Sequence, residues 1–147
     1  MTTRISAAKL RAMGGLTALV GGKVPTEYEE QRAVIRWAHA HGRAWPELDL
    51  LFAIPNGTYT SSINARKRAV AEGVRKGVPD LFLPVARGGK HGLFIEMKRR
   101  KGGKLEPEQR QWLAWLAAQG YATHRCNGSD EAIQVISDYL NGMGDAA

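Results

Sequence analysis

The sequence is poor in cysteine, with Cys126 alone among 147 residues, and its four histidines are scattered along the chain. A single cysteine cannot close an internal disulfide, and these residues lack the spacing of a Cys/His zinc site. No apolar stretch approaches the roughly 20 residues that a membrane-spanning helix needs. We therefore expect a non-membrane protein of a reducing compartment such as the cytoplasm, with Cys126 buried in a strand.

Acidic residues are in the minority, because Lys and Arg number 21 against 14 for Asp and Glu, which leaves a net charge of +7. This excess favours a polyanionic partner such as nucleic acid, with an acidic membrane surface as the weaker alternative. Hydrophobic residues make up 44% of the chain, enough for the core of one domain, which excludes a disordered protein. We expect a basic arm over residues 1–25, a folded domain over 26–141 and a short tail over 142–147.

Turn signals and hydrophobic patterns predict an alternation of helices and strands. Thr26 and Ser129 are suited to cap the first and the last helix, and Pro107 is suited to open the helix before the last. The predicted helices span residues 27–41, 62–76, 107–120 and 129–140, and the predicted strands span 50–54, 80–85, 92–98 and 121–126. This order predicts an α/β fold in which a mixed central sheet is flanked by helices.

The first predicted helix carries carboxylates near its apolar face. A helical wheel places Glu27 near the middle of that face, with Gln31 beside it and Glu30 at its edge. The face itself is formed by Val34, Ile35, Trp37 and Ala38. A carboxylate that points toward a core is unfavourable unless a cation meets it there. Glu27 is therefore the first candidate for a functional role and Glu30 the second, and the alternative is a first-turn glutamate that bends into solvent.

Three polar residues break the pattern of the central strands. Asp80 opens an apolar strand, while Glu96 and Lys98 alternate with Ile95 and Met97 and so share one face of theirs. Antiparallel pairing through the loop 86–91 allows Asp80 to lie beside Glu96. Such violations of pattern are expected at functional sites. The alternative is an ordinary exposed salt pair between Glu96 and Lys98.

The chemistry that such a group can perform is limited. Two carboxylates about 4 Å apart raise each other's pKa unless a divalent cation lies between them. Mg²⁺ suits this position, because it binds oxygen ligands, keeps several waters and needs few protein carboxylates when a phosphate supplies the remainder. A metal-bound water attacking phosphorus, with a nearby ammonium group, performs phosphodiester hydrolysis. We expect Mg²⁺ as the cofactor, with Mn²⁺ able to substitute.

The ordered set of motifs resembles a known nuclease family. Gly-Val-Pro-Asp at 77–80, followed by Glu-Met-Lys at 96–98, is similar to the PD-(D/E)XK nuclease signature. The context resembles its VRR-NUC branch, found alone in phages and fused in DNA-repair nucleases. That branch also has a glutamate four residues before a glutamine, a Pro-Asn-Gly element and a later glutamine. Those elements correspond here to Glu27 and Gln31, to the segment containing Asn56, and to Gln109. The resemblance covers about residues 26–140.

The resemblance implies a restriction-endonuclease-like core with a metal-dependent site. Asp80, Glu96 and the backbone carbonyl of Met97 would bind the metal, Lys98 would act on the attacking water, and Glu27 would assist, also through water. It further implies a stand-alone, phage-type endodeoxyribonuclease of the host cytoplasm, which acts as a homodimer on branched DNA such as four-way junctions or flaps.

The resemblance also assigns supporting roles to Gln31, Asn56 and Gln109. The amide of Gln109 could equally bond a strand end for purely structural reasons. Glu106 departs from the pattern, because a small capping residue is expected there, and it weakens the predicted start of the helix at Pro107.

Two groups of basic residues flank the candidate site in sequence, and a glycine pair at 102–103 would allow a phosphate to approach the second group. The expected DNA contacts are Arg66, Lys67, Arg75, Lys76, Arg99, Arg100, Lys101 and Lys104. Trp112 and Trp115 are interpreted as core and partner surface rather than as base-stacking platforms.

A non-catalytic DNA-binding module with a nuclease-like fold is the competing function. Such a module would share the basic surface but would have no reason to retain both carboxylates together with Lys98. A small RNA-binding protein is a third alternative, and the chain lacks the glycine-aromatic sheet motif of the common RNA-binding domain.

Overall fold

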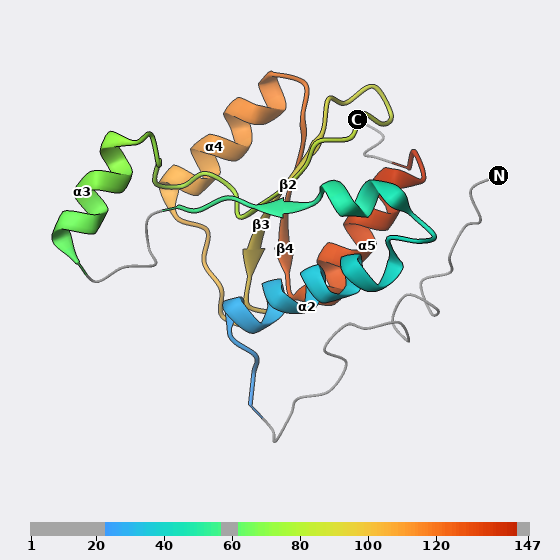
Figure 1. Ribbon diagram of the computed structural model, residues 1–147, viewed down its shortest axis with the longest axis horizontal. Coiled ribbons are helices and arrows are strands. Elements are labelled where there is room, and N and C mark those ends of the chain that lie inside the picture. The colour runs from blue at the N-terminus through green and yellow to red at the C-terminus, as the bar shows by residue number, and fades with distance from the viewer. Residues whose placement is uncertain (1–22, 57–61, 144–147) are drawn as a thin grey trace.

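A computed structural model describes residues 23–56 and 62–143, which form a mixed four-stranded sheet with helices around it (Figure 1). The strands lie in the order β1 (Phe52–Ala53), β2 (Leu81–Leu83), β3 (Leu93–Lys98) and β4 (Ala122–Asn127). The helices are α2 (Glu27–His41), the short 3-10 helix η2 (Pro46–Leu50), α3 (Ile63–Ala71), α4 (Pro107–Ala118) and α5 (Ser129–Leu140). The predicted α/β class is confirmed. Residues 1–22 of the expected arm and 144–147 of the expected tail lie outside the described residues.

Helix α2 has the predicted bounds, but its buried face differs from the predicted one. The Thr26 hydroxyl accepts the Glu29 N–H at 3.2 Å and the Glu29 carboxylate accepts the Thr26 N–H at 2.7 Å, which forms a capping box. The helix lies on the sheet with Glu30 at the centre of its buried face and Glu27 at the margin. Ile35, expected to be buried, is half-buried. The predicted helical periodicity is therefore correct, but the predicted centre of the buried face is wrong.

The predicted buried strand over residues 50–54 is shorter and more exposed than expected. Pro46 begins the 3-10 helix η2, which runs to Leu50 and leaves only Phe52–Ala53 for β1. Both residues of β1 are exposed, because this strand lies at the edge of the sheet formed by the described residues, where it pairs with β2. The apolar composition of this segment reflects contact of the Phe52 ring with Phe82, at a centroid distance of 5.6 Å.

Helix α3 projects from the body of the domain, on the side opposite to α5 (Figure 1). It covers Ile63–Ala71 rather than the predicted 62–76, and Gly73, a poor helix former, follows its end. None of its residues is buried. The helix therefore contributes little to the core and presents its basic side chains to solvent.

Strand β3 lies inside the sheet, between β2 and β4, and all six of its residues are buried. It pairs antiparallel with β2, with Leu81 opposite Ile95, and parallel with β4, with Glu96 opposite Arg125. The predicted antiparallel pairing is thus confirmed, although β2 covers only Leu81–Leu83 and Asp80 is the residue before it. Cys126 is fully buried in β4, as predicted, and burial raises its thiol pKa to about 12.

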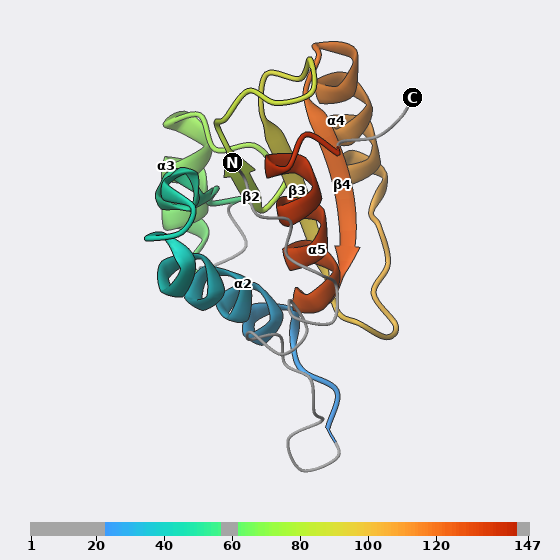
Figure 2. The ribbon, with the colours of Figure 1, turned by 90° about the vertical axis from the view of Figure 1, so that its right-hand side faces the viewer.

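Helices α2 and α5 pack together on one face of the sheet and enclose the hydrophobic core, while α4 lies beyond β4 (Figure 2). Helix α5 starts at Ser129, and the cap is Gly128 rather than Ser129. The start of α4 is better supported than predicted, because the Glu106 N–H donates to the Gln109 side chain at 2.9 Å. Within the described residues, no helix is both long and apolar enough to cross a bilayer.

Candidate active site

Three carboxylates from different elements meet where β3 ends. Glu27 comes from the first turn of α2, Asp80 from the residue before β2, and Glu96 from β3. One carboxylate oxygen from each lies within 4.8 Å of the others. The Lys98 ammonium joins them, at 3.0 Å from Glu96 Oε1 and 3.9 Å from Glu27 Oε2. The four residues predicted to be catalytic therefore form one cluster.

The strand register and one tight turn bring Asp80 into this cluster. Because Leu81 pairs with Ile95, the residue before β2 lies next to Glu96. The turn that leads into it begins at Gly77, which has φ +88°. A Cβ at this position would lie 2.8 Å from the Cβ of Glu108, so glycine is required both by the conformation and by the close approach of α4.

The Asp80 carboxylate is held in a fixed orientation. Its Oδ2 accepts the backbone N–H of Met97 at 2.7 Å, and its Oδ1 accepts the Asn56 side-chain amide at 3.4 Å. The backbone N–H of Ile54 also donates to the Asp80 carbonyl at 2.8 Å, which brings the segment with Asn56 against the site. Asp80 is 5% exposed, so the orientation is set by these groups rather than by water.

Glu96 is a buried carboxylate with few partners. Apart from the ion pair with Lys98, neither of its oxygens has a hydrogen-bond partner in the described part of the chain. Burial, followed by repulsion from Asp80, raises the pKa of Glu96 from its ordinary value to about 7. Burial likewise raises the pKa of Asp80 to about 6, even though the Met97 N–H and Lys98 lower it.

This donor set fits a divalent oxygen-binding cation such as Mg²⁺. Two buried acids with raised pKa values lie beside a third, and the oxygens of Glu96 lack hydrogen-bond donors that would satisfy them. A hard cation would stabilise the ionised forms of all three carboxylates. Asp80, Glu96 and Glu27 are the side chains that could hold it. A role for the Met97 carbonyl stays a prediction.

The motif order and the geometry agree with comparisons to known proteins. The model of the VRR-NUC domain matches residues 25–130. The chain belongs to the VRR-NUC family. A solved structure described as a VRR_NUC domain protein is 33% identical, covers 84% of this chain and 93% of its own chain, and superposes with a TM-score of 0.67. No curated protein matches the chain.

The VRR-NUC domain has a cleft of about 390 Å³ beside the carboxylates. Gln31 and Asn56, both predicted to support the site, contribute to its lining together with Glu27 and Asp80. The cleft is further lined by Tyr28, Arg32 and Ile35. From the sequence, Tyr28 and Arg32 received no role, and Ile35 was expected only on the apolar face of the helix. Helical spacing is the signal that could have found them, because residues three or four apart share a helix face. Tyr28 and Ile35 lie three and four residues from Gln31, and Arg32 lies four residues after Tyr28.

Gln109 of the VRR-NUC domain does not belong to the cluster. Its side-chain oxygen accepts the Glu106 N–H, so the structure assigns it a role at the start of α4. This is a structural role of the kind left open from the sequence, although the partner is a helix cap rather than a strand end. Trp112 is half-buried and donates its indole N–H to the Lys76 carbonyl at 3.1 Å, while Trp115 is 55% exposed.

Seven of the eight predicted DNA-binding residues are exposed, and Arg100 is the exception. The exposed ones are Arg66, Lys67, Arg75, Lys76, Arg99, Lys101 and Lys104. Lys76 forms a solvent-exposed ion pair with Glu108 at 3.1 Å, which leaves its side chain 74% accessible. The Arg100 side chain is 22% exposed and is bound to Glu30. Because its guanidinium is paired with Glu30, Arg100 is less available to a phosphate than the other seven residues, and its DNA contact stays a prediction.

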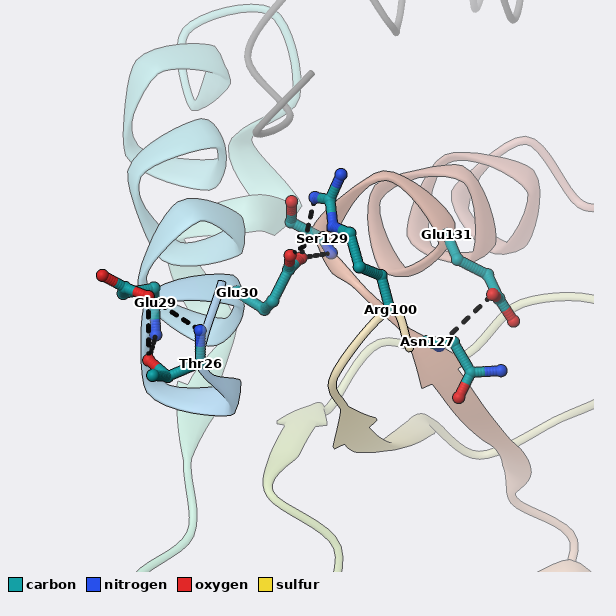
Figure 3. Close-up of polar contacts among 7 residues, drawn as sticks. All are labelled: Thr26, Glu29, Glu30, Arg100, Asn127, Ser129 and Glu131. Atoms are coloured by element: carbon teal, nitrogen blue, oxygen red, sulfur yellow. Dashed lines mark hydrogen bonds and ion pairs between the residues drawn. The ribbon is translucent and has the colours of Figure 1, made fainter. Parts of the chain in front are cut away.

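The structure also separates the two glutamates that the sequence left as alternatives. Glu27 lies in the carboxylate cluster, and its side chain is 44% exposed. Glu30 extends from α2 toward Arg100 and the start of α5 (Figure 3). Its Oε1 accepts Arg100 Nε at 2.7 Å, and its Oε2 accepts the backbone N–H of Ser129.

Proposed function

We propose that this VRR-NUC domain is a Mg²⁺-dependent endodeoxyribonuclease that hydrolyses phosphodiester bonds in branched DNA. The observation that carries the proposal is the joint cluster of Glu27, Asp80 and Glu96 with the Lys98 ammonium. The family supports a nuclease, and the cluster supports a divalent cation as its cofactor.

The acidic residues of the cluster and Lys98 have different roles, which follow from their opposite charges. When bound, the metal supplies a Lewis acid and an activated water for attack on phosphorus. Asp80 and Glu96 hold negative charge at fixed positions, and Glu27 adds a third, more accessible carboxylate at the rim. Lys98 holds its positive charge beside these acids, where it can orient water and stabilise charge that develops in the transition state.

The non-catalytic DNA-binding module remains the second candidate, and the energetics of the cluster argue against it. Burying ionisable carboxylates side by side lowers the stability of a fold, so such an arrangement is expected where it serves a function. A pure binding module would gain nothing from Asp80 and Glu96 at this position. It would also bind a polyanion less well, because the acids repel phosphates.

The substrate is proposed to be DNA, in a branched form, on the basis of charge and shape. The chain carries a net charge of +7, and exposed cations lie on α3 and in the segment after β3. Helix α3 projects from the domain, so its cations reach a part of the substrate distant from the carboxylates (Figure 1). A duplex with a branch presents phosphates in more than one direction, which suits two separate basic surfaces.

We further propose that two copies act together as a homodimer. One cluster of this kind cuts one strand, and symmetric incision of a branched molecule requires two. No residue of α4 is buried within the chain, and its Trp115 side chain is 55% exposed. This surface is available for a partner subunit.

Cleavage assays on defined DNA test the function. Purified protein is incubated with end-labelled linear duplex, flap and four-way junction DNA in Mg²⁺, in Mn²⁺ or in EDTA. We expect cleavage of the branched substrates in either metal and none in EDTA. Equal cleavage of linear duplex would overturn the structural specificity. Binding without cleavage in both metals would favour the non-catalytic module.

A further inference from the structure

Glu30 is a fully buried carboxylate that the proposed chemistry does not use. It is 0% exposed, yet it lies one helical turn after Glu27 on α2. Its two oxygens accept three N–H groups: Arg100 Nε at 2.7 Å, Arg100 Nη2 at 3.2 Å, and the backbone N–H of Ser129 (Figure 3). A guanidinium and the N-terminus of α5 thus satisfy the buried charge together.

The partners of Glu30 come from the segments that continue the catalytic strand. Arg100 lies two residues after Lys98, in the turn that follows β3. The carbonyl of Lys98 accepts the Gly128 N–H at 2.9 Å, directly before Ser129. The bonds of Glu30 therefore tie α2 to the end of β3 and to the start of α5 at a single point.

The backbone at Gly128 is shaped to this arrangement. Its φ is +96°, and a Cβ there would lie 3.1 Å from Glu30 Oε2 and 3.2 Å from the Cβ of Arg100. The positive φ favours glycine, and a side chain there would also have to displace Glu30 or Arg100 by a few tenths of an ångström. The site is built tightly around one position of the Glu30 carboxylate.

Glu27 has no comparable anchor of its own. Within the described residues, its ion pair with Lys98 spans 3.9 Å, and no hydrogen bond fixes its carboxylate. Its distance from Asp80 and Glu96 depends on where α2 lies relative to β3. The bond between Glu30 and Arg100 joins α2 to the segment that follows β3. Glu30 lies one helical turn after Glu27, and Arg100 lies two residues after Lys98.

We propose that Glu30 and Arg100 are positioning residues that hold Glu27 in the metal-binding cluster. The proposal deepens the proposed nuclease function and rests on it for the effect on cleavage. Its effect on metal binding can be measured without DNA. Loss of the bond would let the start of α2 move, so that Glu27 no longer lies within reach of a cation bound to Asp80 and Glu96.

The test is a double-mutant cycle between Arg100→Gln and Glu27→Gln, with Mn²⁺ binding to the DNA-free protein measured by electron paramagnetic resonance. We expect each single variant to weaken Mn²⁺ binding by about 10-fold or more, the scale known for groups that orient a metal ligand. The double variant should bind Mn²⁺ as the Glu27→Gln variant does, because both changes remove the same ligand. Single-turnover cleavage rates should follow the same non-additive pattern.

Two controls separate positioning from general stability. Arg43→Gln removes the same charge from an exposed arginine beyond the far end of α2 and should leave Mn²⁺ binding unchanged. Circular dichroism and thermal melting establish that each variant is folded at the assay temperature. If Arg100→Gln does not fold, Arg100→Lys replaces it, because the lysine keeps a cation beside Glu30 while losing the two-pronged contact.

The outcomes are distinct. Normal Mn²⁺ binding by a folded Arg100→Gln variant would overturn the positioning role, as would effects of Arg100→Gln and Glu27→Gln that simply multiply in the double variant. Failure of the wild-type protein to cleave any DNA, with the non-additive Mn²⁺ binding intact, would instead overturn the proposed function and leave the positioning role standing.

Discussion

Lys98 and the neighbouring carboxylates have opposite charges, so their removal should affect metal binding and the cleavage rate differently. Lys98→Ala leaves Asp80, Glu96 and Glu27 to hold the metal, so we expect Mn²⁺ binding to be retained or strengthened. The single-turnover cleavage rate should fall by about 100-fold or more, the usual effect of removing a positioned proton-transfer or electrostatic group. Rapid-quench assays at saturating metal measure this rate. A near-normal rate in protein free of contaminating nuclease would remove Lys98 from the chemistry.

Replacing an acidic residue of the cluster should abolish cleavage without weakening the binding of DNA. Asp80→Asn removes an anionic ligand, so we expect cleavage to stop while DNA affinity in EDTA stays equal or rises, because repulsion of the phosphates is reduced. Fluorescence anisotropy with labelled DNA measures the affinity. Cleavage at the wild-type rate by this variant would show that the metal is held elsewhere.

The raised pKa values predict an unusual dependence of stability on pH. Asp80 and Glu96 have folded-state pKa values of about 6 and about 7, above those of ordinary carboxyls at 3.8 and 4.5. The folded state therefore binds more protons than the unfolded state between about pH 4 and 7. The contribution of these two groups to the free energy of unfolding is greatest at low pH and is lost as the pH rises through about 6 to 7.

Glu96→Gln should reveal this effect in EDTA. At pH 8 the variant removes a buried charge, so we expect a higher melting temperature than wild type, corresponding to up to about 3 kcal/mol. At pH 5 the difference should shrink, because Glu96 is then already protonated. Thermal melts at both pH values test this, with the exposed Glu72→Gln as a control expected to show no such change. An equal or lower melting temperature at pH 8 would contradict the prediction.

Helix α3 is the element whose contribution to DNA binding is easiest to isolate, because none of its residues is buried. If about five cations contact phosphates, log K should fall with log salt with a slope of about −4 to −5. Replacing Arg66 and Lys67 together by glutamine should make that slope shallower by about 1.8, or about 0.9 per contact, without changing the fold. Arg43→Gln should leave it unchanged. A double variant with the wild-type slope would remove α3 from the DNA-binding surface.

The assembly of the whole molecule provides a separate prediction. We expect light scattering to give twice the mass of the chain at micromolar concentrations, because paired incision needs two sites. Trp115→Glu introduces a charge on the exposed face of α4 and should shift the protein toward the monomer if this face forms the interface. A monomer mass for the wild-type protein across the concentration range would refute the homodimer.

Features encoded by neighbouring residues could be read from the sequence. The bounds of α2 follow from a capping residue, first-turn acids and a terminal glycine, all within the helix or beside it. The common face of Glu96 and Lys98 follows from strand alternation, and the ion pair between them agrees with it. The ordered motifs led to the VRR-NUC family because their residues and spacing are themselves sequence features.

Features that depend on how helices and strands pack together could not be predicted from the sequence. The rotation of α2 about its axis decided that Glu27, and not Glu30, lies with Asp80 and Glu96. Edge placement decided that β1 is exposed despite its apolar composition. Arg100 stands among basic residues in the sequence, and these neighbours do not reveal that its guanidinium pairs with a glutamate buried in another element.

The physical reason is the separation of the partners along the chain. Glu30 and Arg100 lie 70 residues apart, and Glu30 and Ser129 lie 99 apart. Local propensity acts over a few residues and carries no information about which distant group will satisfy a buried charge. That choice is made when the helices dock on the sheet, because a charge removed from water there must find its partners within hydrogen-bond distance.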